Sequence, residues 1–390
     1  MMRKKMLLML VLSFLIVIFA AANTFAQDFN FASKAQLLME TNSGKILYEH
    51  NIHEKLYPAS VTKIMTMLLA MEALEEGKVK LDDLIPVSEK AAGLGGSQLF
   101  LAPGDRISFA EMMIGIGAGS ANDASWAMAE YLAGATEVFV ARMNERAQEL
   151  GMVNTNFVNP HGLHDENHYT TASDIAKMSL ELLRHPKIHE WITIWYDEEF
   201  LQGKIKKREG VYLSNSNQII RYYEGGDGLK TGFTREAANC VSATAAREGT
   251  RFLAVILGAP GRPALFAEAR TLLDYGFANW RSLPVTEQGE VLGRVKVDKG
   301  TVAEIEFVAK ESYALLVRKG MKDKVTHEII IPIRLTAPLE RTTQIGTLLV
   351  KSAEGEELGR VALVPAADVQ RANIITFLRR FVGHWLRFGR

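Results

Sequence analysis

The feature that most constrains the fold is a change of hydrophobic pattern along the chain: helical spacing in the middle, with strand-like segments on both sides of it. On the N-terminal side, residues 35–40 and 45–49 indicate two strands separated by a turn at 42–44. On the C-terminal side, residues 239–246 and 251–258 indicate a second pair. Hairpins at both ends of a helical region predict an α+β fold, with one antiparallel sheet packed against a helical cluster.

The helical spacing occurs in five segments. They cover residues 61–74, 109–113, 121–132, 137–150 and 171–183. Ser173 is the expected N-cap of the last segment. A further strand is expected over 229–234, after Gly228, and the turn at 247–250 is expected to join the two strands that follow. The middle of the chain is therefore rich in helix.

Beyond residue 283 the pattern changes to short alternating strands. They are expected at 291–297, 302–307, 313–317, 328–335, 347–350 and 360–363. Because 390 residues suffice for two ordinary domains, we expect a larger domain over 27–282 and a small β-rich domain over 283–367.

The first 26 residues have the pattern of a secretory signal peptide. Basic residues at 3–5 precede an apolar stretch over 6–22, and small residues precede Gln27. The alternative is a retained membrane helix, because such a stretch is close to the ~20 residues that span a bilayer. Removal of the three basic residues leaves 42 Lys and Arg against 45 Asp and Glu, a net charge of −3. No nucleic-acid partner is indicated.

The last segment, 368–390, is predicted to form an amphipathic helix. Its apolar face holds Ile374, Leu378, Phe381, Trp385 and Phe388, and arginines at 371, 379, 380, 387 and 390 lie largely on the other side. Arginines opposite an aromatic face favour a helix that lies in a membrane surface. The alternative is a terminal helix that docks on its own domain.

Several conspicuous residues are assigned no chemistry. Cys240, the single cysteine, cannot form an internal disulfide and is expected to pack inside a strand. His164 and His168 are four apart, but the Asn-Pro-His-Gly sequence at 159–162 indicates a loop, so no metal site is expected. The basic run at 204–208 is interpreted as a solvated hairpin tip.

The sequence Tyr-Pro-Ala-Ser-Val-Thr-Lys at 57–63 contains a candidate nucleophile and base. If a helix begins near Ser60, Lys63 lies beside it on nearly the same face. A serine hydroxyl needs a base to take its proton, and a lysine serves when burial or nearby positive charge lowers its pKa. The first backbone N–H groups of the helix suit a developing oxyanion. Alone, however, Ser-x-x-Lys is expected about once by chance in a chain of this size.

Two further motifs give this pair its significance. Ser120-Ala121-Asn122 opens the helical segment 121–132 after a glycine-rich approach, and Lys230-Thr231-Gly232 lies in the strand after Gly228. The three motifs follow the order and approximate separation found in active-site serine enzymes that act on penicillins and cell-wall peptides.

The chain resembles the low-molecular-mass penicillin-binding proteins, specifically the serine-type D-alanyl-D-alanine carboxypeptidases. The resemblance extends to connecting segments at 95–98, 103–105, 156–163, 168–172 and 227–229, and it covers essentially the whole mature chain. It implies the penicillin-binding/β-lactamase-like transpeptidase fold, followed by the small β domain and a terminal membrane-anchoring helix.

The resemblance also implies residue roles. Ser60 forms the acyl-enzyme with the penultimate D-alanine, Lys63 accepts its proton, and Ser120 relays a proton to the leaving amine. Asn122 hydrogen-bonds the substrate amide, Lys230 keeps the site positive, and Thr231 contacts the terminal carboxylate. Backbone N–H groups of Ser60 and of Phe233, the residue after Gly232, form the oxyanion hole. No cofactor is implied, and penicillins are expected to inhibit by acylation.

The expected activity is removal of the terminal D-alanine from peptidoglycan pentapeptide stems, at the outer face of the cytoplasmic membrane. Three alternatives stay open: an endopeptidase on existing cross-links, a β-lactamase, and a non-catalytic wall-binding protein. Asp165 and Glu166 lack the Glu-x-x-Leu-Asn context of a deacylating carboxylate, so a turn is the preferred interpretation. Phe233 is expected to influence substrate preference or the rate of drug deacylation.

Overall fold

The computed structural model describes residues 29–320 and 325–373. The chain divides into two compact units, Met1–Gly276 and Phe277–Arg390. The expected signal peptide at 1–26 and most of the expected terminal helix lie outside the described residues. Within the described ranges, no helix combines the length and apolarity that a membrane crossing requires.

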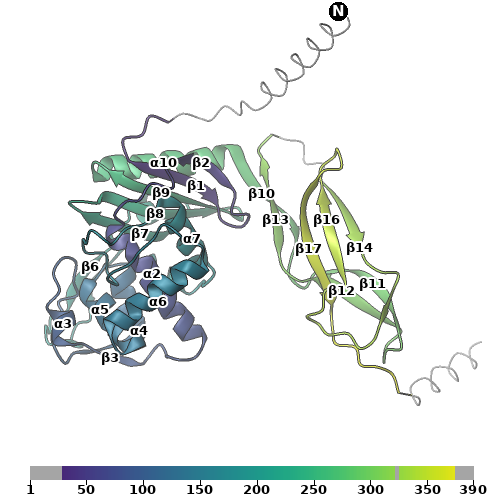
Figure 1. Cartoon of the computed structure of the whole chain (residues 1–390), viewed down its shortest axis with the longest axis horizontal. Helices are drawn as coiled ribbons and strands as arrows, with labels where there is room; N and C mark the ends of the chain where they lie inside the picture. The colour runs from purple at the N-terminus through teal and green to yellow at the C-terminus, as the bar shows by residue number, and fades with distance from the viewer. Residues whose placement is uncertain (1–28, 321–324, 374–390) are drawn as a thin grey trace, which may run out of the picture. The chain divides into compact units, whose positions relative to one another are not determined.

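A five-stranded antiparallel sheet forms the framework of the first unit (Figure 1). Its order is β2 (Ile46–His50), β1 (Ala35–Glu40), β9 (Thr250–Ala259), β8 (Ala238–Arg247) and β7 (Gly226–Thr234). The N-terminal hairpin joins the C-terminal strands through β1 and β9, which pair antiparallel along their lengths. The expected single sheet built from hairpins at both ends is therefore confirmed.

The turn between β8 and β9 shows why these strands pair in this register. Glu248 and Gly249 both have positive φ, 48° and 74°. Two successive positive φ values characterise the tight turns that match the twist of a hairpin. The turn expected at 247–250 is present, and it sets β8 and β9 side by side in the centre of the sheet.

The part of the chain between the N-terminal and the C-terminal strands of the sheet forms the expected helical cluster. It comprises the 3-10 helix η1 (Ala59–Thr62) and the helices α2 (Lys63–Glu75), α4 (Phe109–Gly117), α5 (Asn122–Ala133), α6 (Thr136–Glu149) and α7 (Ala172–Leu183). Helix α2 packs against α5 and α7, and α7 packs on β1 and β9. Residues all around α2, including Ile64, Met65 and Met67, are fully buried, as expected of a helix in the middle of a core.

Two helix starts differ from expectation. The segment expected to begin as an α-helix at residue 61 begins with the 3-10 turn η1, and α2 starts at Lys63. Ser173 is not the cap of α7: the Thr171 hydroxyl accepts a hydrogen bond from the Asp174 backbone N–H at 3.1 Å. A threonine three residues before a first-turn acid is the usual arrangement for a helix N-terminus.

Several elements of the first unit were not expected. They are the strands β3 (Leu84–Pro86), β4 (Arg106–Ser108), β5 (Tyr196–Phe200) and β6 (Val211–Ser214), and the helices α3 (Glu89–Ala92), α8 (Ile188–Ile192), α9 (Ile219–Tyr222) and α10 (Arg262–Asn279). The basic run at 204–208 lies between the paired strands β5 and β6, as the hairpin interpretation required. Helix α10 fixes the chain near its start, because Glu268 accepts a hydrogen bond from the Ala32 backbone N–H at 2.7 Å.

The second unit is built almost entirely of strands. A six-stranded sheet has the order β14 (Thr326–Ile330), β16 (Gly346–Lys351), β17 (Glu357–Pro365), β12 (Glu304–Ala309), β11 (Val291–Asp298) and β15 (Arg334–Thr336). A separate pair consists of β10 (Trp280–Thr286) and β13 (Tyr313–Arg318). The single strand expected at 328–335 is wrong, because this segment divides into β14 and β15 at opposite edges of the sheet.

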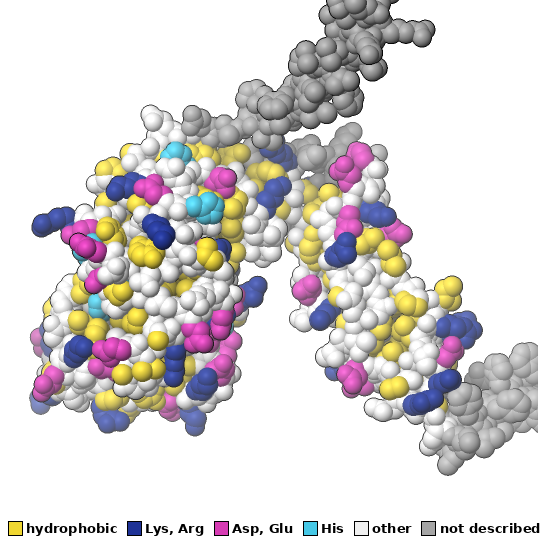
Figure 2. Space-filling model, in the orientation of Figure 1, with side chains coloured by type: hydrophobic (Ala, Val, Ile, Leu, Met, Phe, Trp, Pro, Cys, Tyr) yellow, Lys and Arg dark blue, Asp and Glu magenta, His cyan; other side chains and the backbone are white. Residues whose placement is uncertain are grey.

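Both ends of this unit also differ from expectation. The boundary was expected after residue 282, but residues 280–282 pair with β13 and belong to the β unit. Residues 368–373 are not helical: Val369 forms a bridge with Leu339, and Arg371 forms one with Gly300. Acidic and basic side chains are interspersed over the face seen in Figure 2.

Candidate active site

The three motifs meet around one cavity of about 600 Å³ in the first unit. Its lining includes Ser60, Ser120, Asn122, Thr231, Gly232 and Phe233 from the motifs, together with Gly96, Ser97, Gly162, Leu163, Ser216, Thr234, Asn239, Arg262, Leu265 and Phe266. No acidic residue is in this set. The other two motif residues, Lys63 and Lys230, are almost completely buried and do not line the cavity.

Close backbone packing positions Ser60. It lies in η1 directly after Ala59, whose φ of 46° is unusual for a residue with a side chain. A Cβ atom at Gly162 would lie 1.9 Å from the Ala59 carbonyl oxygen, and one at Gly232 would lie 2.9 Å from the Ser60 backbone nitrogen. Only glycines allow these two segments to approach the serine so closely.

Lys63 is held by three acceptors. Its Nζ atom lies 3.1 Å from the Ser60 Oγ, 2.7 Å from the Asn122 Oδ1 and 2.7 Å from the His161 carbonyl oxygen. Burial lowers the pKa of Lys63 well below its ordinary value, and the nearby positive charge of Lys230 lowers it further. The negative charge of Asp123 opposes this shift in the Lys63 pKa. An amine with a strongly lowered pKa, next to a serine hydroxyl, can act as its base.

Ser120 and Asn122 stand at the start of α5. Ser120 has a φ of 58°, a conformation that few residues other than glycine adopt. The Asn122 side chain accepts from Lys63 through Oδ1 and donates to the Gly95 carbonyl through Nδ2 at 2.7 Å. One amide thus links the lysine of the first motif to the loop that begins at Gly95.

Asp123 fixes the same loop from the interior. Its carboxylate accepts from the backbone N–H groups of Leu99, at 3.0 and 3.1 Å, and of Leu101, at 3.1 Å. Burial raises the pKa of Asp123, and these backbone hydrogen bonds oppose the rise.

Strand β7 supplies the third motif. Burial lowers the pKa of Lys230 to about 7, and its Nζ lies 3.1 Å from the Thr231 carbonyl oxygen. The Thr231 hydroxyl is hydrogen-bonded to the hydroxyl of Ser216. The Phe233 side chain is 67% exposed at the cavity.

Sequence reasoning did not single out Ser216 or Arg262. Ser216 lies between β6 and α9, and Arg262 is the first residue of α10. The Arg262 Nη2 donates to the Ser216 carbonyl oxygen at 3.0 Å. A signal was available in the sequence Asn215-Ser216-Asn217, because asparagine side chains commonly fix the backbone of irregular segments.

The histidines near the site have structural environments. Burial, with Lys63 nearby, lowers the pKa of His161 to about 3, and its ring stacks on Trp126 at 5.8 Å. Burial lowers the pKa of His168 to about 4, and its Nε2 lies 2.8 Å from the Thr62 hydroxyl. His164 packs edge-on against Tyr57. The described parts of the chain contain no group of three or more His, Cys, Asp and Glu side chains placed to hold a metal ion.

Cys240 lies in β8 and is fully buried, which confirms its packing role. Burial raises the pKa of its thiol to about 11, so the reactive thiolate is suppressed at neutral pH. The segment at 165–167 is a turn, as expected: the His168 backbone N–H donates to the Asp165 carbonyl oxygen at 3.0 Å. Neither Asp165 nor Glu166 lines the cavity.

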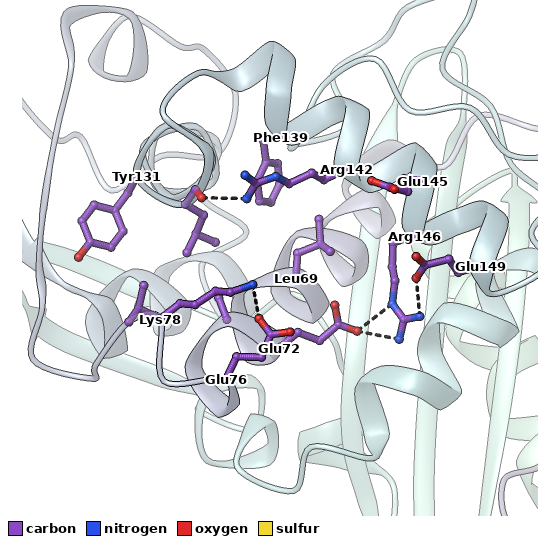
Figure 3. A pocket seen from close by; sticks show the side chains of 13 residues that line it. Leu69, Glu72, Glu76, Lys78, Tyr131, Phe139, Arg142, Glu145, Arg146 and Glu149 are labelled. Carbon is purple, nitrogen blue, oxygen red and sulfur yellow. Dashed lines mark hydrogen bonds and ion pairs between the residues drawn. The ribbon is translucent and has the colours of Figure 1, made fainter.

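A second cavity, of about 690 Å³, lies among α2, α5 and α6 (Figure 3). Its charged side chains largely pair with one another: Arg146 with Glu72 and Glu149, and Lys78 with Glu76. No serine, threonine, cysteine or histidine lines it. It therefore lacks the arrangement found at Ser60, a serine hydroxyl at the cavity with a buried lysine beside it.

Comparison with known proteins agrees with this geometry. The family model described as D-alanyl-D-alanine carboxypeptidase matches residues 21–261, and the model of the penicillin-binding protein 5 C-terminal domain matches 280–371. The D-alanyl-D-alanine carboxypeptidase DacF of Bacillus subtilis is 39% identical over 99% of this chain and 100% of its own length.

Two solved structures have the same fold. Penicillin-binding protein 5 of Haemophilus influenzae has a TM-score of 0.73 and 28% identity, over 88% of this chain and 99% of that one. Penicillin-binding protein D2 of Listeria monocytogenes, in its ampicillin-bound form, has a TM-score of 0.57 and 28% identity, over 64% of this chain and 99% of its own. The chain therefore belongs to the D-alanyl-D-alanine carboxypeptidase family of serine peptidases.

Proposed function

We propose that this protein removes the terminal D-alanine from peptidoglycan pentapeptide stems through an acyl-enzyme on Ser60. The observation that carries the proposal is the 3.1 Å contact between the Ser60 Oγ and the buried Nζ of Lys63. Burial and the charge of Lys230 lower the pKa of Lys63, which favours the neutral amine that a base requires.

In the acylation step, the Ser60 oxygen attacks the carbonyl carbon of the penultimate D-alanine while Lys63 takes the hydroxyl proton. The backbone N–H groups of Ser60 and Phe233 stabilise the resulting oxyanion. The close approach of Gly232 to the Ser60 nitrogen supports this pairing, because it brings β7 against η1. Ser120 passes a proton to the leaving amine, the carbon–nitrogen bond breaks, and D-alanine departs.

In the deacylation step, water attacks the ester carbonyl and gives up a proton to the Lys63 amine. The ester bond to Ser60 breaks, the serine oxygen recovers a proton, and the shortened stem is released. Asn122 holds the substrate amide during both steps, a role supported by its position at the cavity and its hydrogen bond to Lys63.

The carboxylate of the terminal D-alanine is expected to bind between Thr231 and Arg262. Both side chains line the cavity, and Lys230 adds positive charge behind it. A guanidinium and a hydroxyl suit a carboxylate well, since each can donate to one of its oxygens. The absence of acidic residues from the cavity lining supports the same binding mode.

Penicillins are expected to acylate Ser60 in the same way, because their strained amide and carboxylate match these groups. The ampicillin-bound Listeria relative supports this expectation. No observation favours the endopeptidase or the β-lactamase over the carboxypeptidase, and the turn at Asp165 and Glu166 supplies no carboxylate to the cavity.

The proposed location rests on the sequence of the two terminal segments. We propose that residues 1–26 export the protein and that the segment 374–390 attaches it to the outer face of the cytoplasmic membrane. The hydrophobic pattern of 374–390 and its arginines support the attachment.

The activity is tested with a diacyl-L-Lys-D-Ala-D-Ala peptide and protein that lacks residues 1–26 and 374–390. Release of D-alanine, abolished in a Ser60→Ala variant, is the expected result. If labelled penicillin attaches to Ser60 without any release of D-alanine, cross-linked muropeptides become the substrates to test, and the endopeptidase replaces the carboxypeptidase.

A further inference from the structure

Ser216 connects the two groups assigned to the substrate carboxylate. Its hydroxyl is hydrogen-bonded to the hydroxyl of Thr231, and its carbonyl oxygen accepts from the Nη2 of Arg262 at 3.0 Å. The three residues come from separate elements: β7, the β6–α9 connection and the start of α10. All three line the cavity at Ser60. Ser216 thus touches both groups without belonging to any of the three motifs.

The backbone of Ser216 is fixed by its two neighbours. Asn215 donates through Nδ2 to the carbonyl oxygen of Ile192 at 2.8 Å, and its Oδ1 accepts from the Asn217 backbone N–H at 2.9 Å. Asn217 donates to the carbonyl oxygen of Gly228, in β7, at 2.9 Å. Both asparagines are buried. Ser216 is therefore held at a set distance from β7, with its side chain directed at Thr231.

The direction of the Ser216–Thr231 hydrogen bond determines what Thr231 can do. A hydroxyl has one proton and two lone pairs, so Thr231 cannot donate to Ser216 and to a substrate at the same time. If Ser216 donates, the Thr231 proton is free to point into the cavity. An anionic ligand favours this arrangement, because a carboxylate accepts hydrogen bonds and cannot donate them.

Arg262 is held in a similar way. Its Nη2 is bonded to Ser216, and its guanidinium lies over the Phe266 ring, 5.9 Å from the centroid. A guanidinium has five N–H donors, so others are available to a carboxylate in the cavity. Ser216 therefore fixes the spacing between one hydroxyl donor and one cationic donor.

We infer that Ser216 is a positioning residue for recognition of the substrate's C-terminal carboxylate: its hydroxyl donates to Thr231, so that Thr231 and Arg262 both donate into the cavity. This inference rests on the proposed carboxypeptidase function and adds to it a positioning residue that none of the three motifs contains.

The test compares diacyl-L-Lys-D-Ala-D-Ala with its C-terminal amide, in the wild type and in Ser216→Ala. Loss of the Ser216–Thr231 hydrogen bond, which orients the Thr231 donor, predicts a rise of about 2- to 10-fold in KM for the acid, with kcat nearly unchanged. The amide reaction should be unaffected. Ser216→Thr retains the hydroxyl and should restore the KM of the acid. Ser214→Ala is the matched control, because Ser214 is exposed in β6 and does not line the cavity.

The possible failures are distinguishable. Suppose that the wild type turns over the acid and that Ser216→Ala has the same KM and the same preference for acid over amide. This result overturns the inference and leaves the proposed function intact. An equal loss on acid and amide also overturns it, because it indicates a general structural effect. A wild type that releases D-alanine from neither peptide overturns the proposed function, and the inference with it.

Discussion

The Nζ of Lys63 lies 3.1 Å from the Oγ of Ser60, and the two residues lie on either side of a junction between two helix types. Ser60 belongs to the 3-10 turn η1, and Lys63 is the first residue of α2. Side chains three apart eclipse one another in a 3-10 turn, whereas they are offset in an α-helix. The three-residue spacing of nucleophile and base therefore matches the local backbone.

Lys63→Arg tests the lysine as the base. Arginine keeps the positive charge but does not give up its proton in a protein. We expect D-alanine release and acylation by labelled penicillin to fall by about 10² to 10⁴-fold, the usual contribution of a general base. Lys78→Arg, at an exposed ion pair in the other cavity, is the control and should behave as the wild type. Near-normal acylation in a folded Lys63→Arg variant would exclude this role.

The buried Lys230 predicts a specific dependence of stability on pH. Its pKa is about 7 in the folded protein, against about 10.4 in an unfolded chain. Between these values the unfolded state binds more protons, so the contribution of Lys230 to the free energy of unfolding becomes more favourable as the pH rises. Relative to Lys230→Met, the wild type should gain up to about 1.4 kcal/mol per pH unit from pH 7 to pH 10.

Urea unfolding of both proteins at pH 7, 8 and 9 measures this difference. The comparison is made with Lys63→Met in both proteins, because the charge of Lys230 also lowers the pKa of Lys63. Contributions from the other groups that the two proteins share then cancel. Parallel curves, with a constant difference in the free energy of unfolding, would mean that Lys230 keeps its ordinary pKa in the folded state.

Gly162→Ala tests the close packing that positions Ser60. The new Cβ would lie 1.9 Å from the Ala59 carbonyl oxygen, at a φ of +85°. Gly134→Ala is a matched control, because Gly134 has a φ of +77° with nothing within 4 Å of an added Cβ. Both variants incur about 1–2 kcal/mol of backbone strain. The clash at Gly162 should add about 1–3 kcal/mol.

Thermal unfolding and the rate of penicillin acylation distinguish the two glycine variants. Gly162→Ala should lose both stability and acylation, since the clash displaces the residue next to Ser60. Gly134→Ala should lose a little stability and retain acylation. Equal behaviour of the two variants would contradict the packing argument.

The sheet and the main helices could be predicted because their signals are local. Residues 35–50 and 239–258 carry alternating or buried strand patterns with turn residues between them, and both hairpins form where expected. The prediction of one strand over 328–335 is wrong because of Pro332. Proline has no backbone N–H to donate to a neighbouring strand, and Pro332 separates β14 from β15. That proline was visible in the sequence.

The site was only partly predictable. The three motifs could be identified from residue types and order, but Ser216 and Arg262 come from segments without a recognisable pattern. Their contacts use a hydroxyl and a backbone carbonyl, which every serine possesses, so only the fold reveals them. The 3-10 start of the first helix was likewise hidden, because η1 depends on tertiary packing by Gly162 and Gly232.

Phe233→His tests the influence of the residue after the third motif. Phe233 is 67% exposed at the cavity, so its replacement should leave the free energy of unfolding nearly unchanged. Loss of apolar contact with a bound substrate should raise KM for the diacyl peptide by about 2- to 10-fold. The rate of penicilloyl-enzyme hydrolysis, measured beside it, should change as well. If neither this KM nor this hydrolysis rate differs from that of the wild type, Phe233 has no part in specificity.

Deletion of residues 374–390 tests membrane attachment without disturbing the β unit. The cut must follow residue 373, because the Thr301 N–H donates to the Gln370 carbonyl at 2.8 Å and the Ala372 N–H donates to the Lys299 carbonyl at 2.7 Å. A cut at residue 370 would remove these hydrogen bonds, and release of the protein from the membrane could then not be distinguished from unfolding of the β unit. We expect the signal-cleaved full-length chain to sediment with membranes and the truncated chain to stay in solution, with equal penicillin acylation. A truncated protein that still sediments would show that another part of the chain is the anchor.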